Sequence, residues 1–148
     1  MSDITIRPLR ESDQADWRRL WTDYLTFYES SVSEEVYETT FARLIGDDPQ
    51  DFTALIAEQA QKPVGLVHFV FHRHNWTVGN TCYLQDLYAD PSVRGTGVGR
   101  KLIEAVYEAA DREGAASVYW LTQDFNTTAR NLYDRVGTVT PFVKYVRG

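Results

Sequence analysis

The residues with the clearest chemical potential form a glycine-rich run, Arg-Gly-Thr-Gly-Val-Gly-Arg, at positions 94–100. Glycine lets the backbone turn sharply and brings amide N–H groups close to a ligand. Because an apolar helical pattern follows directly, these amides lie at the positive end of a helix, where the first N–H groups have no intrahelical partner. A diphosphate suits such a turn best, and Lys101 adds positive charge.

Two widespread phosphate motifs do not fit this run. A Walker A loop needs a second glycine where this chain has Arg100. The dinucleotide fingerprint G-x-G-x-x-G also fails, because Gly99 comes one residue too early for its third glycine. The alternative is a turn that merely begins a helix, although three glycines cost more conformational entropy than a plain helix start requires.

A second pattern follows, in which Asn126, Ala129, Leu132, Tyr133 and Gly137 recur at helical spacing. The spacing predicts a short helix over 127–136 that ends at the glycine. Its tyrosine is either a proton donor of a site or an ordinary core residue, and the spacing alone leaves both open.

The run 94–100 resembles the acetyl-CoA loop, [Q/R]-x-x-G-x-[G/A], of the GCN5-related N-acetyltransferases (GNATs). The second pattern resembles the closing N-x-x-A-x-x-L-Y-x-x-x-G signature of the same superfamily, in the expected order. The resemblance spans nearly the whole chain and is strongest over 83–137. It implies a mixed α/β (α+β) GNAT fold: one domain over 1–148, with a central mixed sheet flanked by helices and two splayed parallel strands at 81–88 and 117–121.

The resemblance also implies the reaction and the residues that carry it. An acetyl group passes from acetyl-CoA to a primary amine by direct attack in a ternary complex, and no metal is needed. The backbone N–H of Leu87 stabilises the oxyanion, and backbone groups of Leu87 and Ala89 bind the pantetheine arm. Tyr133 protonates the leaving sulfur and also contacts the coenzyme, as does Asn126. The diphosphate binds at Arg94, Gly95, Thr96, Gly97, Val98, Gly99 and Arg100.

The base is less easily assigned. A free alkyl amine resembles lysine, with a pKa of about 10.4, and must lose a proton before it attacks. The strand Tyr-Leu-Gln-Asp-Leu-Tyr at 83–88 resembles the branch of spermidine/spermine and fungal histone, polyamine and D-amino-acid acetyltransferases, whose polyamine members carry Glu-Asp at its centre. Here Gln85 cannot accept a proton, so Asp86 is the nearest carboxylate, acting directly or through water. The alternative is a structural role for Asp86.

The resemblance also implies an acceptor pocket under the first helix and the loop after it. Aromatic residues recur there at helical spacing and are mostly core by that pattern, but Tyr28 is a candidate contact with the substrate. Glu29 is a second acidic candidate for binding a cationic amine, beside Gln85 and Asp86.

Three histidines and one cysteine have other possible uses. His68, His72 and His74 share strand parity and are a conceivable metal set, but exposed histidines of a hairpin are the plainer interpretation, and no metal site is predicted. Cys82 reads as a small buried residue, with acetyl-cysteine chemistry as a minor alternative.

The pattern of apolar and turn residues along the chain predicts the strands and helices that must position these residues. Strands are expected at 4–9, 52–58, 64–72, 81–88, 117–121 and 142–146, and helices at about 13–28, 34–44, 98–113 and 127–136. Three hairpin-linked strands followed by a β-α-β crossover indicate a mixed sheet.

Composition limits the classes of partner that the chain is expected to bind. The chain has 148 residues and a net charge of −6, which argues against nucleic acid as a partner and is compatible with a cationic small molecule. Its apolar runs are far shorter than the roughly 20 residues that cross a bilayer, so no membrane association is expected. The lone cysteine and the lack of an apolar signal core favour the cytoplasm. The resemblance implies a homodimer, since related enzymes commonly dimerise, and an apolar strand at 142–146 would be a sticky edge if left unpaired.

Three functions compete. The first is an N-acetyltransferase that acts on a small amine, either a polyamine or an amino acid. The second is a protein or histone lysine acetyltransferase, and the third is an acyl-CoA-binding module without catalysis, for which Gln85 is the best argument. The sequence does not name the acceptor amine.

Overall fold

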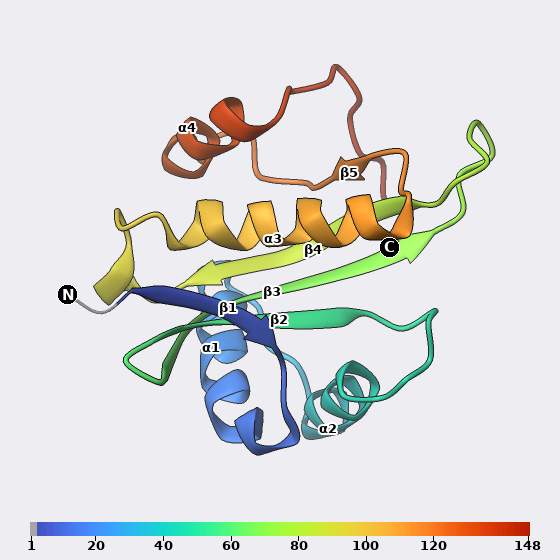
Figure 1. Ribbon diagram of the computed structural model, residues 1–148. Helices are drawn as coiled ribbons and strands as arrows, with labels where there is room; N and C mark the ends of the chain where they lie inside the picture. The colour runs from blue at the N-terminus through green and yellow to red at the C-terminus, as the bar shows by residue number, and fades with distance from the viewer. Residues whose placement is uncertain (1–2) are drawn as a thin grey trace.

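The computed structural model describes residues 3–148, which form one sheet with helices on both faces (Figure 1). In chain order the elements are β1 (Ile4–Pro8), the 3-10 turn η1 (Glu11–Asp13), α1 (Gln14–Phe27), α2 (Glu34–Leu44), β2 (Thr53–Gln59), β3 (Lys62–His72), β4 (Thr81–Ala89), the 3-10 turn η2 (Pro91–Val93), α3 (Val98–Glu113), β5 (Val118–Tyr119) and α4 (Thr127–Val136).

Local sequence explains where several elements begin and end. The Ser33 side chain accepts a hydrogen bond from the Val36 N–H and caps α2. Gly114 ends α3 in the left-handed region, at φ 68°. The turn between β2 and β3 places Ala60 and Gln61 at positive φ, which is the geometry of a tight hairpin.

The sheet has the strand order β1-β2-β3-β4-β5. The first four strands are antiparallel to their neighbours. The last pair is parallel and very short, because β4 and β5 are in register only at Cys82 with Val118 and at Tyr83 with Tyr119. Most of β4 therefore has no strand partner on its outer side, which confirms the splayed pair.

One irregularity changes the faces of β4. The register with β3 shifts where His68 lies opposite Asp86 and Phe69 opposite Leu84, so Gln85 is an additional residue, a β-bulge. Before the bulge, Leu84 packs in the core beneath α3. After it, Asp86 lies opposite His68, and Tyr88 belongs to the core beneath α1 and α2.

Two hydrophobic clusters fill the space on either side of the sheet. One joins α3 to the sheet through side chains such as Leu102 and Val106, and partly buried residues of α4 pack against it. The other joins α1 and α2 to the opposite face around Trp17 and Leu20. Figure 1 shows this division, with α1 and α2 on one side of the sheet and α3 and α4 on the other.

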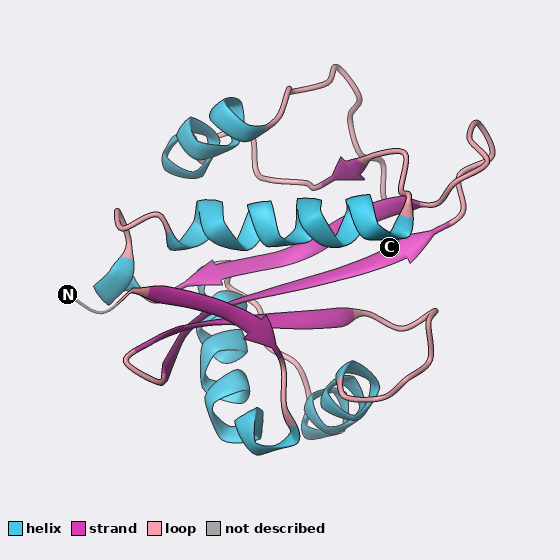
Figure 2. Cartoon of the chain, viewed as in Figure 1, coloured by secondary structure: helices cyan, strands magenta, loops and turns pink. Residues whose placement is uncertain are grey.

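Two expectations about strands were wrong. Residues 142–146 form no strand, and Figure 2 shows the end of the chain as a loop. Their apolar side chains are exposed, and an edge strand without a neighbour cannot complete its hydrogen bonds. The strand expected at 117–121 contains only Val118–Tyr119, because the splay ends its pairing with β4.

No helix within residues 3–148 is long and apolar enough to cross a membrane.

Gly65 of β3 provides a test of the packing between the sheet and α3. A Cβ atom on Gly65 would lie 2.9 Å from the carbonyl oxygen of Tyr88 and 3.1 Å from Cγ1 of Val98. We expect Gly65→Ala to lower the free energy of unfolding by about 1–3 kcal/mol, as overpacked core substitutions do. Denaturant unfolding measures this change, and a variant as stable as the parent would contradict such close packing.

Candidate active site

The open edge of β4 presents backbone groups to the gap beside β5. The Asp90 N–H donates to the Val64 carbonyl at 2.8 Å, so even-numbered residues after the bulge face β3. Because successive residues of a strand point their polar groups to opposite sides, Leu87 and Ala89 face the gap. Arg94 Nε donates to the Ala89 carbonyl from this side, at 3.1 Å. The two residues predicted to bind the pantetheine arm therefore share the open edge.

The glycine-rich turn lies between β4 and the beginning of α3. Gly95 and Gly97 have φ values of 82° and 89°, and a Cβ at either position would meet nothing within 4 Å. The first hydrogen bond of the helix runs from the Lys101 N–H to the Gly97 carbonyl, at 3.0 Å. The preceding amides, Val98 to Arg100, have no intrahelical acceptor.

Two amides of this turn are already engaged, and the first is the Arg94 N–H, which donates to the Pro91 carbonyl at 3.4 Å. The Thr96 N–H donates to the Val93 carbonyl at 3.2 Å, and the Thr96 hydroxyl donates to the same oxygen. The Val98 side chain is 2% exposed and belongs to the core. Thr96 therefore stabilises the turn rather than binding a ligand. Val98 can offer a ligand only its backbone N–H.

The segment between β5 and α4 contains two further polar residues of interest. Asn126 caps α4 by accepting a hydrogen bond from the Ala129 N–H at 3.3 Å. Thr122 Oγ1 is buried without a hydrogen-bond partner, and a buried polar atom of this kind requires an explanation such as a ligand. Leu132 contacts the position where a Cβ of Gly99 would lie, at 3.2 Å, so α4 packs directly on the first turn of α3.

Tyr133 is held on α4 against Trp120, with ring centroids 5.5 Å apart. Burial raises the pKa of its hydroxyl to about 12, and the nearby Tyr28 adds to this rise. The phenol is therefore protonated throughout the physiological range.

Asp86 is buried, at 7% exposure, and its carboxylate lies in a network of side chains. Oδ2 of Asp86 is 2.8 Å from Nδ1 of His68. The other ring nitrogen of His68, Nε2, accepts a hydrogen bond from the Trp17 indole at 3.0 Å. An acidic side chain is thus positioned on β4 by residues of β3 and α1.

Three phenols surround this carboxylate. Burial raises the pKa of Tyr24, Tyr28 and Tyr83, and the negative charge of Asp86 raises each of them further. Tyr28 lies at the carboxyl end of α1 and Tyr83 on β4, so α1 forms one wall of the site and β4 another.

Two predicted substrate contacts lie at the surface. Gln85 is exposed at the bulge, and its carbonyl is 3.5 Å from the Tyr24 hydroxyl. Glu29 is exposed directly after α1, with φ 56°. The structure brings Gln85, Asp86 and Tyr28 together, whereas Glu29 lies at the edge of this group, on the turn that follows the helix.

The histidines differ from the expectation of an exposed set. His68 is buried, at 2% exposure, because β3 turns it under α1, whereas His74 lies in the exposed turn beyond the strand. No group of three or more potential metal ligands occurs among the residues that the structure describes. His68 is a residue that sequence reasoning missed. The available signal was the alternation along β3. His68 comes two residues after Leu66, which is buried, so the two side chains lie on the same face of the strand.

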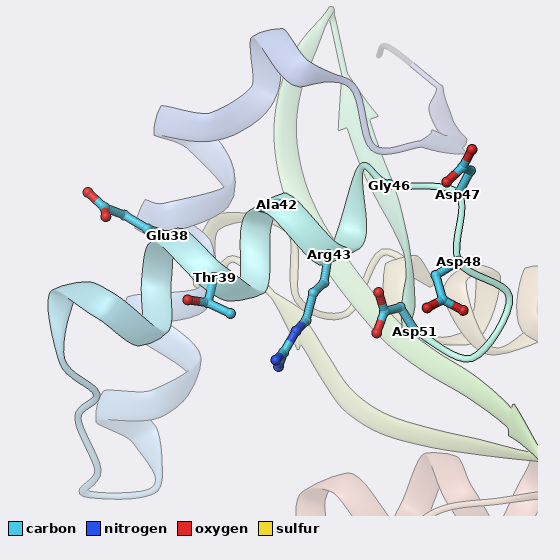
Figure 3. A pocket seen from close by; sticks show the side chains of 8 residues that line it. All are labelled: Glu38, Thr39, Ala42, Arg43, Gly46, Asp47, Asp48 and Asp51. Carbon is cyan, nitrogen blue, oxygen red and sulfur yellow. The ribbon is translucent and has the colours of Figure 1, made fainter.

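One surface depression lies away from this site. It has a volume of about 550 Å³ and is lined by α2 and the loop that follows it, including Arg43, Asp48 and Asp51 (Figure 3). None of the predicted site residues lines it. Its acidic side chains lie on an open surface away from β4, so this depression has no part in the chemistry of the candidate site.

Cys82 is fully buried, and burial raises the pKa of its thiol to about 11. Since the thiolate is the reactive form, we expect no alkylation of the native protein by iodoacetamide at pH 8, and complete alkylation after unfolding. Mass spectrometry measures both. Rapid labelling of the native chain would restore the acetyl-cysteine alternative.

Comparison with known proteins agrees with this geometry. Residues 16–138 match the family described as "Acetyltransferase (GNAT) family". The chain is 37% identical to the D-amino-acid N-acetyltransferase HPA3 of Saccharomyces cerevisiae over 97% of its length and 90% of that protein. It is 32% identical to the thialysine N-epsilon-acetyltransferase of Mus musculus over 93% of its length and 85% of that protein.

A solved structure has the same fold. The aminoglycoside N-acetyltransferase AAC(6')-Iy in complex with CoA superposes with a TM-score of 0.85, at 20% identity, over 100% of this chain and 96% of that one. The family match over most of the sequence and the similarity to curated acetyltransferases along nearly its full length show that this chain belongs to the GNAT family and is an acetyl-CoA-dependent N-acetyltransferase.

Proposed function

We propose that this enzyme acetylates the primary amine of a small molecule, a polyamine or an amino acid, by direct attack of the amine on acetyl-CoA. The observation that carries the proposal is the buried carboxylate of Asp86 on β4, held 2.8 Å from His68, together with the protonated phenol of Tyr133 on α4. A proton acceptor and a proton donor are the two groups that this reaction requires.

The residues on the open edge of β4 fit acetyl-CoA. The amides at Gly95, Gly97 and Val98 to Arg100 would hold the diphosphate at the positive end of α3, and Arg94 adds charge beside them. Leu87 and Ala89 would bind the pantetheine arm as a neighbouring strand would. The unpartnered Thr122 hydroxyl and the capping residue Asn126 lie between β5 and α4, in the segment that would face this arm.

Each reacting atom then has a protein group assigned to it. Bound acetyl-CoA supplies the thioester carbonyl. Asp86 accepts the proton that the amine loses, directly or through water, and the Leu87 N–H donates to the carbonyl oxygen as negative charge develops there. Tyr133 donates its proton to the leaving sulfur. The inert thiol of Cys82 supports direct attack over an acetyl-cysteine route.

The charge and walls of the site favour a cationic acceptor. An ammonium group is attracted by Asp86 and by the faces of tyrosines such as Tyr24 and Tyr28, and the net charge of −6 favours its approach. The relatives are named for a D-amino acid and for thialysine, which are both small amines. Gln85, the argument for a non-catalytic module, is the exposed bulge residue, while the acid beside it is buried in the site.

Coenzyme A release in the presence of an amine panel tests the proposal. The panel contains spermidine, D- and L-amino acids, thialysine and a histone-tail peptide. We expect turnover with at least one small amine, and a kcat about 100-fold lower in Tyr133→Phe, since a positioned acid contributes about 10²–10⁴. Tyr145→Phe is the matched control, because it removes a hydroxyl outside the candidate site and keeps the apolar ring, and it should keep the parent rate.

Acetylation of the peptide alone would instead favour a protein acetyltransferase. Tight acetyl-CoA binding without turnover on any amine would indicate the binding module.

We also propose a cytoplasmic homodimer. The lone Cys82, a free thiol, suits a reducing compartment. Phe142, Val143, Tyr145 and Val146 are between 73% and 93% exposed, and such a run of apolar side chains is typical of a contact surface. β5 is the edge strand of the sheet, where a further strand can add.

Light scattering after size exclusion tests the dimer. We expect the mass of two chains for the parent and of one chain for Val143→Asp, because a buried charge without a partner opposes association. Val36→Asp, an exposed apolar position on α2, is the control and should leave the mass unchanged. A monomeric parent would contradict the proposal.

A further inference from the structure

A directional chain of hydrogen bonds reaches Asp86 from inside the protein. It begins at the Trp17 indole on α1, passes through the imidazole of His68 on β3 and ends at Oδ2 of Asp86 on β4, with lengths of 3.0 and 2.8 Å. Trp17 is 1% exposed and His68 is 2% exposed. Neither residue takes part in the proton transfers proposed above.

The chemistry of the three groups leaves one arrangement of protons. An indole N–H can only donate, so Nε2 of His68 must accept from Trp17. The imidazole proton is therefore on Nδ1, where it is donated to the Asp86 carboxylate. If Nε2 also carried a proton, its N–H would face the N–H of the Trp17 indole inside the core, and neither group could accept a hydrogen bond. The indole thus holds His68 as the neutral Nδ1–H tautomer.

His72, on the same strand, shows that this arrangement is specific to His68. Nδ1 of His72 donates to the Arg73 carbonyl at 2.8 Å, and Nε2 lies 2.8 Å from the Tyr119 hydroxyl. A hydroxyl can donate or accept, so His72 keeps both of its hydrogen bonds in either protonation state. The two histidines differ in the partner of Nε2.

We propose that His68 is a positioning residue for the reaction, which uses the proton fixed on its Nδ1 to hold one oxygen of Asp86 and so aims the other oxygen at the acceptor amine. This inference rests on the proposed function, in which Asp86 accepts the proton of the amine. His68 itself touches neither substrate nor coenzyme, and it exchanges no proton during the reaction.

The position of Asp86 explains why such a partner is needed. Asp86 follows a β-bulge, where the strand changes direction and the ladder is interrupted. A buried carboxylate requires hydrogen-bond donors, and a reacting group that moves by about 1 Å can lose a factor of about 10² in rate. Other ionisable groups that face Asp86 are the phenols of Tyr24 on α1, of Tyr28 just after α1 and of Tyr83 on β4.

The first test measures the tautomer directly. Long-range ¹⁵N–¹H spectra of the labelled full chain at pH 7.5 distinguish Nδ1–H from Nε2–H imidazoles, and the sequence has only three histidines to assign. We expect His68 to be the Nδ1–H tautomer. An Nε2–H tautomer, or a doubly protonated ring, would overturn the inference whatever the activity of the enzyme.

The second test separates donation from packing. Asn carries an amide N–H at the same number of bonds from Cβ as imidazole Nδ1, whereas Leu has a similar shape and no donor. With the preferred amine, we expect His68→Leu to lower kcat about 10- to 100-fold and His68→Asn to remain within about threefold of the parent. The KM for acetyl-CoA should not change, because the coenzyme binds on the other side of β4.

His72→Leu is the matched control and should keep the parent kcat, and thermal unfolding of every variant checks that the fold is retained. Parent-like turnover in a folded His68→Leu would overturn the inference. Equal losses in His68→Leu and His68→Asn would also overturn it, because the donor would then not be the cause.

A double variant distinguishes failure of this inference from failure of the proposed function. In an Asp86→Asn background, His68→Leu should cause no further loss of kcat, because the two residues act as a unit. If Asp86→Asn is as active as the parent, the assignment of Asp86 fails. If Asp86→Asn is inactive while His68→Leu is active, the positioning role alone fails.

Discussion

A single additional residue in β4 sets the geometry on which the rest of the site depends. Gln85 interrupts the ladder with β3, so the side chains of β4 exchange faces at this point. The change places Asp86 beneath α1 and turns the backbone of Leu87 toward the gap beside β5. A regular strand would put Asp86 with Leu84 in the core beneath α3 and Leu87 against β3. The bulge therefore provides the acid and the open edge together.

The two sequence motifs, the glycine-rich turn and the tyrosine helix, meet across the same gap. Gly99 leaves room for Leu132, and a Cβ on Gly137 would lie 3.0 Å from Trp120. Trp120 in turn contacts Tyr133. The glycines of both motifs thus have packing roles beside any binding role: they let α4 approach α3 and β5 closely enough to hold its tyrosine at the end of the open edge.

The fold was predictable where one physical pattern dominates. Helical periodicity and caps predicted α2 and α3 with their observed bounds, and the glycine-rich turn followed from composition and position. The burial of His68 was not found, because alternation along β3 shows only that His68 and His72 share a face, and depth depends on α1 above it. The prediction of a strand at 142–146 was wrong for a related reason. Apolar alternation indicates a strand, but a strand forms only where a neighbouring strand completes its backbone hydrogen bonds.

The pairing of β4 with β5 over only two residue pairs affects how the molecule holds together. No residue of α4 is fully buried, so the carboxyl-terminal part of the chain is attached mainly by the contacts of a few half-buried side chains with α3. Segments with so little buried surface open at a lower free energy than the centre of a domain. A ligand that bridges β4 and this segment would restrain both, so part of its intrinsic affinity is spent on ordering the protein, and occupancy becomes coupled to local stability.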